Sequence, residues 1–365
     1  MSRVTRALID LSALRHNLTI VQQHCPDAKV LCVIKADAYG HGMSQIARAL
    51  PDVDALAVAS LAEAIALRAQ GITAPVVLLE GFTQAADLNL IRQYGFEAVV
   101  HHESQVEMLE ADRGAAIPVW LKIDTGMHRL GINPDFAASI FRRLLACSAA
   151  RPVAVMSHLA CADERLDDYT NQQIAIFTET TNGVEVPRSL LNSGGILGWP
   201  QAQCDWVRPG IMLYGASPFG SGTASDENLL PVMTLQAELI AVNQFNKGDT
   251  IGYSRTWTCP EDMSVGVVSI GYGDGYPRHA KNGTPVLLNG KRAELIGRVS
   301  MDMITIDLRQ HPDAKIGDTV TLWGEGLPVD EIATAADTIA YELLCGVTKR
   351  VRFEYNNMPT LKPAS

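Results

Sequence analysis

The sequence predicts an α/β protein: a closed (β/α)8 barrel in residues 1–228, followed by a mostly β domain in residues 229–365. Three observations support this. Eight short apolar runs occupy the first two-thirds of the chain, and most are continuously apolar, as strands covered on both faces should be. Segments with helical spacing lie between these runs. Past Pro231 the pattern changes to longer alternating strands with tight turns.

The predicted barrel strands span residues 30–34, 55–60, 75–80, 96–100, 118–124, 152–158, 189–192 and 205–211. Helical spacing is clearest in residues 60–71, which open at a Ser60 N-cap, carry Glu63 three residues later and close at Gly71. Eight strand–helix alternations over about 200 residues fit a closed barrel better than an open sheet. A doubly wound sheet is the alternative.

The second domain is predicted from six strand-like segments: VMTLQAELIAV, GDTIGYS, SVGVVSI, TPVLLNG, DMITIDL and GDTVTLW. The Gly/Ser-rich residues 219–228 have the composition of a solvated linker. A final helix is predicted over residues 330–346.

Composition favours an enzyme that acts on small molecules. Hydrophobic residues make up 47% and charged residues 19% of the chain, as in ordinary globular domains. A net charge of -10 without a basic run argues against nucleic-acid binding. The seven scattered cysteines form no CxxC pair, so they predict reduced thiols and no metal site. No secretory signal or membrane span is predicted, which favours the cytoplasm.

Polar residues stand where the predicted barrel strands end, which is where catalytic groups lie in such folds. They are Lys35, Lys122, Asp124, His158, Asn192, Ser193 and Arg208. The loops NSGG (192–195) and RPGI (208–211) follow strands 7 and 8, where barrels often bind phosphate. A phosphate site together with a strand-end lysine indicates pyridoxal phosphate, whose aldehyde forms a Schiff base with lysine.

The residues then match a known family over nearly the whole chain. The motifs are VIKADAYGHG (33–42), LKIDTGMHRLG (121–131), SHLACADE (157–164), NSGG, DWVRPGIMLYG (205–215), GYSRTW (252–257), GYGDGYPR (271–278) and GRVSMDMITID (297–307). In this order they closely resemble bacterial alanine racemase, a pyridoxal 5'-phosphate enzyme built from a barrel and a C-terminal β domain. The resemblance implies an isomerase that interconverts L-alanine and D-alanine.

Racemisation needs acid–base groups on both faces of the substrate carbon, because the proton leaves one face and returns to the other. By resemblance, Lys35 is the Schiff-base lysine and the base for D-alanine, and Tyr253 is the base for L-alanine. Family precedent suggests that His158 and Arg208 assist Tyr253. In the family Arg208 also faces the pyridine nitrogen, where a permanent cation disfavours protonation and weakens the ring as an electron sink.

The resemblance also implies binding roles. Residues similar to the phosphate-contacting set are Tyr39, Ser193, Gly210, Ile211 and Tyr341. Arg129 resembles the residue near the cofactor phenolic oxygen and the substrate carboxylate, and the Met301 backbone resembles a substrate contact.

Further supporting residues are Asn192, Tyr272 at the entrance, and Asp302, which positions the Met301 loop. Lys122 matches a position that is carbamylated in some relatives, which would place an anion beside Arg129.

In the family, Tyr253 and Met301 reach the pocket of the partner subunit, so a homodimer with shared active sites is expected. The alternatives are a barrel-type pyridoxal-phosphate decarboxylase, a racemase of broader specificity and a non-catalytic cofactor-binding barrel. Tyr253 and the SMDM motif favour the racemase. The sequence leaves open whether the product serves cell-wall synthesis or the enzyme degrades D-alanine as a nutrient.

Overall fold

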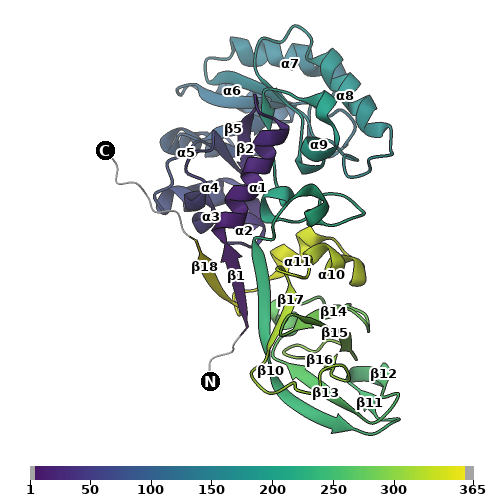
Figure 1. The fold of residues 1–365 in the computed structure, drawn as a ribbon. Coiled ribbons are helices and arrows are strands. Elements are labelled where there is room, and N and C mark those ends of the chain that lie inside the picture. The colour runs from purple at the N-terminus through teal and green to yellow at the C-terminus, as the bar shows by residue number, and fades with distance from the viewer. Residues whose placement is uncertain (1–4, 358–365) are drawn as a thin grey trace. The chain divides into compact units, whose positions relative to one another are not determined.

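The computed structural model describes residues 5–357, and the chain divides into two compact units (Figure 1). The barrel unit contains Leu18–Met212 and Pro218–Ser221, and the β unit contains residues 5–17, Leu213–Ser217 and residues 222–357. Residues 5–17, 213–217 and 222–228 thus fall in the β unit, whereas the predicted barrel domain spans residues 1–228. Within residues 5–357, no helix has the length and apolar character to cross a membrane.

The barrel unit contains a closed barrel of eight strands, which confirms the predicted fold class. Each strand pairs with its neighbours in parallel. The strands are β2 (Lys29–Val33), β3 (Ala55–Val58), β4 (Val76–Leu78), β5 (Glu97–Val100), β6 (Ile117–Lys122), β7 (Ala150–Met156), β8 (Arg188–Ser189) and β9 (Trp206–Val207).

Helices connect successive strands of this barrel, as the alternation in the sequence predicts. They are α2 (Lys35–Tyr39), α3 (Met43–Ala49), α4 (Leu61–Ala69), α5 (Asp87–Tyr94), α6 (Glu103–Ala111), α7 (Pro134–Ala146), α8 (Tyr169–Thr180), α9 (Ser193–Gly198) and the 3-10 turn η1 (Pro200–Ala202). The predicted start of α4 is confirmed: Ser60 and Glu63 form a capping box. Helix α1 (Leu11–His24) contains the division between the units.

Aromatic side chains fill the interior of the barrel. The rings of Trp120 on β6 and Trp206 on β9 lie 5.3 Å apart at 67°. Because β6 and β9 are not neighbours in the barrel, this contact crosses its interior. The indole N–H of Trp120 donates to Glu97 at 2.6 Å, so the buried ring has a polar partner. The barrel is therefore a packed core, and its chemistry must lie at a strand end.

The β unit is built on an eight-stranded sheet with the order β13-β16-β15-β14-β17-β10-β1-β18. Its strands are β1 (Arg6–Asp10), β10 (Met233–Phe245), β13 (Met263–Val268), β14 (Pro285–Leu288), β15 (Lys291–Ile296), β16 (Ile304–Asp307), β17 (Thr319–Trp323) and β18 (Arg352–Asn356). Strand β10 also pairs with β13, so six of these strands form a closed ring. A separate hairpin joins β11 (Thr250–Ile251) and β12 (Trp257–Thr258).

The prediction of one continuous C-terminal helix over residues 330–346 is wrong. Two helices, α10 (Val329–Ala335) and α11 (Ala340–Gly346), occupy this stretch. Asp337 breaks the helix because its φ of 57° is left-handed. The predicted linker also contains a 3-10 turn, η3 (Ala224–Glu227). The other 3-10 turns are η2 (Ile211–Tyr214), η4 (Tyr253–Arg255) and η5 (Tyr272–Asp274).

Candidate active site

The lysine that ends the first barrel strand opens an unusual left-handed turn. Residues 36–39 all have φ between 51° and 56°, although none of them is glycine. Such conformations cost L-residues about 1–2 kcal/mol each and persist only where the surrounding structure holds them. Gly40 continues the turn with φ 78°. The backbone beside Lys35 is therefore held in an unfavourable shape, as is typical of functional sites.

Cationic side chains from several strand ends gather at the C-terminal end of the barrel. Lys35 follows β2, Lys122 ends β6, Arg129 lies in the loop after β6, and Arg208 follows β9. The charges of Arg208, Arg129 and Lys35 all act on Lys122. The structure thus brings together four positive groups that the sequence placed at separate strand ends.

Burial and the nearby positive charges together lower the pKa values of Lys122 and His158. Burial lowers the pKa of Lys122 to about 8, with Arg208 and Arg129 adding to the effect and Asp124 opposing it. Burial likewise holds the pKa of His158 well below its usual value, and the same cations contribute. His158 is therefore neutral at physiological pH. A ligand carrying several negative charges would relieve the repulsion among these groups.

Arg208 is buried and tied to the barrel by its side chain. Its guanidinium donates to the Ser189 hydroxyl at 2.5 Å and to the carbonyl oxygens of Ser157 and Leu190 at 2.5 and 3.1 Å. Burial lowers the pKa of Arg208 to about 10, which leaves it protonated at neutral pH. The positive charge is thus fixed in place between β7, β8 and β9.

The predicted phosphate loops lie against each other. The buried Ser193 hydroxyl accepts from the backbone N–H groups of Gly210 and Met212 at 2.9 and 3.3 Å, and Asn192 caps α9 by accepting from Gly195 at 3.0 Å. A Cβ on Gly210 would lie 2.5 Å from the Tyr39 hydroxyl. Ser193, Gly210 and Tyr39 therefore meet in a narrow space that is suited to hydrogen bonds with a small anion.

Five predicted site residues belong to the β unit: Tyr253, Tyr272, Met301, Asp302 and Tyr341. Tyr253 begins η4 and its side chain is 68% exposed, while Met301 is 52% exposed. The Tyr272 backbone N–H donates to the carbonyl of Ser300 at 3.0 Å, so Tyr272 lies beside the Met301 loop. Exposed aromatic and methionine side chains in one area are typical of a surface that contacts a partner.

Asp302 is held by Arg350, which sequence analysis missed. Arg350 pairs with Asp302 at 2.5 Å and with the buried carboxylate of Asp274 at 3.4 Å. It thereby links the Met301 loop to η5. Tyr341 lies in the first turn of α11 and is partly buried.

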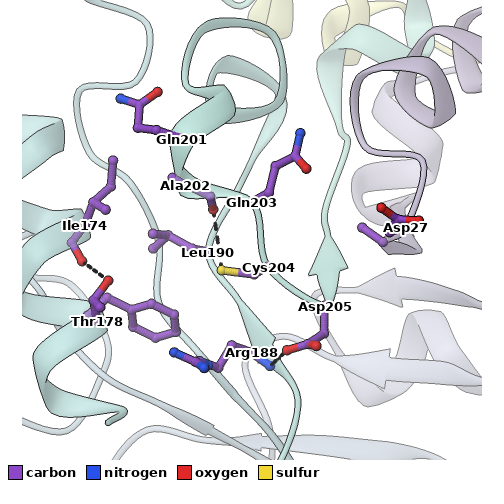
Figure 2. A pocket seen from close by; sticks show the side chains of 12 residues that line it. Asp27, Ile174, Thr178, Arg188, Leu190, Gln201, Ala202, Gln203, Cys204 and Asp205 are labelled. Carbon is purple, nitrogen blue, oxygen red and sulfur yellow. Dashed lines mark hydrogen bonds between the residues drawn. The ribbon is translucent and has the colours of Figure 1, made fainter.

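A cavity of about 450 Å³ lies at the opposite end of the barrel unit (Figure 2). Its lining includes Asp27, Arg188, Cys204 and Asp205, which precede or begin strands β2, β8 and β9. Figure 2 shows the Arg188 backbone N–H on the Asp205 carboxylate and the Cys204 thiol on the Ala202 carbonyl. This cavity contains no predicted site residue, and the cationic cluster lies at the other strand ends.

Sequence analysis also missed two residues that contact the left-handed turn. The Glu63 carboxylate accepts from the Ala36 backbone N–H at 2.8 Å, although its pattern indicated only a helix cap. His41 contacts the carbonyl oxygens of Ala38 and Tyr39 at 3.1 and 2.9 Å. The only signal for His41 was its place in the KADAYGHG motif.

Comparisons with known proteins agree on one family. The family models of the alanine racemase N-terminal and C-terminal domains match residues 9–218 and 232–355. The alanine racemase of Nitrosococcus oceani is 52% identical over 351 residues, which cover 95% of this chain and 98% of that protein. The alanine racemase of Aeromonas hydrophila is 48% identical over 351 residues, covering 96% and 98%.

Solved structures give the same result. The biosynthetic alanine racemase of Pseudomonas aeruginosa has a TM-score of 0.94 and 44% identity, covering 97% of this chain and all of that one (100%). The alanine racemase of Bartonella henselae, whose structure has covalently bound pyridoxal phosphate, has a TM-score of 0.87 and 30% identity, covering 96% and 99%.

Proposed function

The chain belongs to the alanine racemase family, and we propose that it interconverts L-alanine and D-alanine with pyridoxal 5'-phosphate as its cofactor. The observation that carries the proposal is the convergence of Lys35, Lys122, Arg129 and Arg208 at one end of the barrel. Matches to both domains over nearly the whole chain favour this function over a barrel-type decarboxylase.

The cluster suits this cofactor and substrate because both are anionic. Pyridoxal phosphate carries a phosphate and a phenolic oxygen, and alanine adds a carboxylate. The narrow space at Ser193, Gly210 and Tyr39 would take the phosphate together with Ile211, and the phosphate contact of Tyr341 stays a prediction. Arg129 would bind the substrate carboxylate and the phenolic oxygen, while Arg208 would face the pyridine nitrogen. When bound, the cofactor would withdraw electrons from the substrate Cα and so acidify its proton.

Two side chains would move the proton. Lys35 Nζ would hold it on the side of D-alanine, and the phenolic oxygen of Tyr253 would hold it on the side of L-alanine. His158, neutral because its pKa is lowered by burial and by the nearby cations, would share the hydrogen-bond network with Arg208. A fixed positive charge at Arg208 disfavours a proton on the pyridine nitrogen, which limits side reactions.

The second acid–base group would come from a partner subunit. Tyr253 and Met301 are exposed in the single chain, and Tyr272 lies beside the Met301 loop. Burial of this surface against the barrel of a second copy would complete each site and remove apolar area from water. A homodimer is thus part of the proposal. Asp302 and its partner Arg350 would hold the loop in shape.

Lys122 would carry a carbamate. With a pKa of about 8, a fraction of its amine is neutral at physiological pH, and the neutral amine is the form that adds to carbon dioxide. The ammonium first loses one proton, and the neutral amine then forms a bond from nitrogen to the carbon of CO2 and releases a second proton, so a cation becomes an anion beside Arg129. A cytoplasmic location of the protein, which is a separate point, stays a prediction.

The proposal is tested by incubating the protein and pyridoxal phosphate with L-alanine and, in a separate sample, with D-alanine in deuterium oxide. Enantiomer-resolved chromatography and mass spectrometry follow the wild type, Lys35→Ala and Tyr253→Phe. D-alanine with deuterium at Cα is expected from the wild type only, and Tyr253→Phe should lose exchange of L-alanine more than exchange of D-alanine. Release of carbon dioxide instead would favour the decarboxylase, and equal turnover of L-serine would indicate broader specificity.

A further inference from the structure

The left-handed turn after Lys35 has two ends, and each end is held by a side chain that the proposed reaction does not use. Helical turns leave backbone N–H groups without partners at one end and carbonyl groups at the other. Ala36 begins this turn and Tyr39 precedes the glycine that closes it. Because the conformation is unfavourable for every residue from 36 to 39, the groups that bind its ends decide whether it persists.

Glu63 binds the N-terminal end. One carboxylate oxygen accepts from Ala36 N–H at 2.8 Å, and the other accepts from Ala59 and Ser60 N–H at 2.8 and 3.3 Å. The side chain thereby joins the end of β3 and the start of α4 to the residue next to Lys35. A charged acceptor makes the hydrogen bond to Ala36 stronger than a neutral one would.

His41 binds the C-terminal end. It is fully buried, and its Nδ1 contacts the carbonyl oxygens of Ala38 and Tyr39. Carbonyl oxygens only accept, so Nδ1 must carry the proton. Burial lowers the pKa of His41 to about 4, and the ring therefore stays neutral in this tautomer. Asp37 adds a third contact by accepting from Met43 N–H at 2.7 Å, which fixes the turn to α3.

We infer that Glu63 and His41 are positioning residues for Lys35: they hold the left-handed turn that sets where its amine stands. This inference rests on the proposed function, because Lys35 must be the residue that carries the cofactor. Neither side chain touches the reacting atoms. Glu63 thereby gains a role in cofactor capture, although its sequence pattern explains only a helix start.

Glu63→Gln tests the first end with almost no change in shape. An amide keeps one acceptor oxygen and replaces the other with an NH2 donor, which cannot accept from a backbone N–H, so the side chain no longer bridges Ala36 to Ala59 and Ser60. Ser60→Ala is the matched control, because it removes the other half of the same capping box and leaves the contact with Ala36 intact. Two measurements are made on each variant: hydrogen exchange of residues 36–43 in the cofactor-free protein, and affinity for pyridoxal phosphate by absorbance titration.

In the Glu63→Gln variant, the amides of residues 36–43 should exchange faster than in the wild type. The variant should also bind pyridoxal phosphate roughly tenfold more weakly, the loss typical of one charge-assisted hydrogen bond. Ser60→Ala should stay within about twofold of the wild type in affinity. Faster exchange without weaker binding would overturn the inference, as would unchanged exchange. Equal loss of affinity in Ser60→Ala would also overturn it, because the effect would then come from α4.

His41→Leu and His41→Asn test the second end. The Asn amide places a donor near the position of Nδ1 and should restore most of the affinity that Leu loses; equal loss in both would contradict the role of the Nδ1 proton. Lys35→Ala separates this inference from the proposed function. If Lys35→Ala loses cofactor binding while Glu63→Gln does not, the inference alone fails. If Lys35→Ala binds pyridoxal phosphate like the wild type, the assignment of Lys35 fails and the inference falls with it.

Discussion

A neutral residue in place of Lys122 should stabilise the cofactor-free protein. The Lys122 side chain is buried, and its pKa falls from 10.5 to about 8 in the folded state because of this burial and of the charges of Arg208, Arg129 and Lys35. Between these two values the unfolded chain binds the extra proton, so the free energy of unfolding rises with pH through this window. Below pH 8 the wild type carries the full destabilisation. The difference in pKa corresponds to about 3 kcal/mol.

Lys122→Met keeps the length of the side chain and removes the charge. Urea unfolding of the cofactor-free protein, in buffer free of carbon dioxide, should show the variant more stable by about 3 kcal/mol at pH 7 and by only about 1.5 kcal/mol at pH 9.5. Lys247→Met, at an exposed position, should change stability by less than about 0.5 kcal/mol at both values. A Lys122→Met variant that is less stable than the wild type at pH 7 would show that Lys122 is not an unrelieved buried cation.

Two further predictions concern the space assigned to the phosphate. Ser193→Ala removes the hydroxyl that accepts from Gly210 and Met212, so the free energy of unfolding in urea should fall by about 1–3 kcal/mol. The control Ser139→Ala, at an exposed position, should lower it by less than about 0.5 kcal/mol. Equal stability of the two variants would contradict the role of the buried hydroxyl. Gly210→Ala puts a methyl group 2.5 Å from the Tyr39 hydroxyl and should weaken pyridoxal-phosphate binding in an absorbance titration. In the Tyr39→Phe background, where this hydroxyl is absent, Gly210→Ala should weaken binding less than it does in the wild type. Additive effects in this double-mutant cycle would show that the two groups do not meet.

The barrel was predictable because its strands are local features. A run such as VLCVI is apolar on both faces wherever it pairs, and the polar residue that follows it marks the strand end. Lys35, Lys122 and Arg208 were found in this way. The motif order then identified the family, because eight short patterns in one sequence constrain each other far more than any one alone.

The features that were missed depend on distant contacts. Strand β1 has only five residues and pairs with β10 and β18, more than 200 residues away in sequence. The left-handed turn has alanines at positions 36 and 38, where local preference favours a right-handed helix. Its conformation is set by Glu63 from the next strand–helix unit, and a single sequence gives no sign of such a contact. The same holds for Arg350, whose two acidic partners lie 48 and 76 residues before it.

The role of Lys35 is tested most directly by finding which lysine forms the covalent bond with the cofactor. The protein is saturated with pyridoxal phosphate, reduced with borohydride to fix the linkage, digested and mapped by mass spectrometry. The phosphopyridoxyl mass is expected on the peptide that contains Lys35. Label on Lys122, the other lysine of the cationic cluster, or no label on either residue, would contradict it.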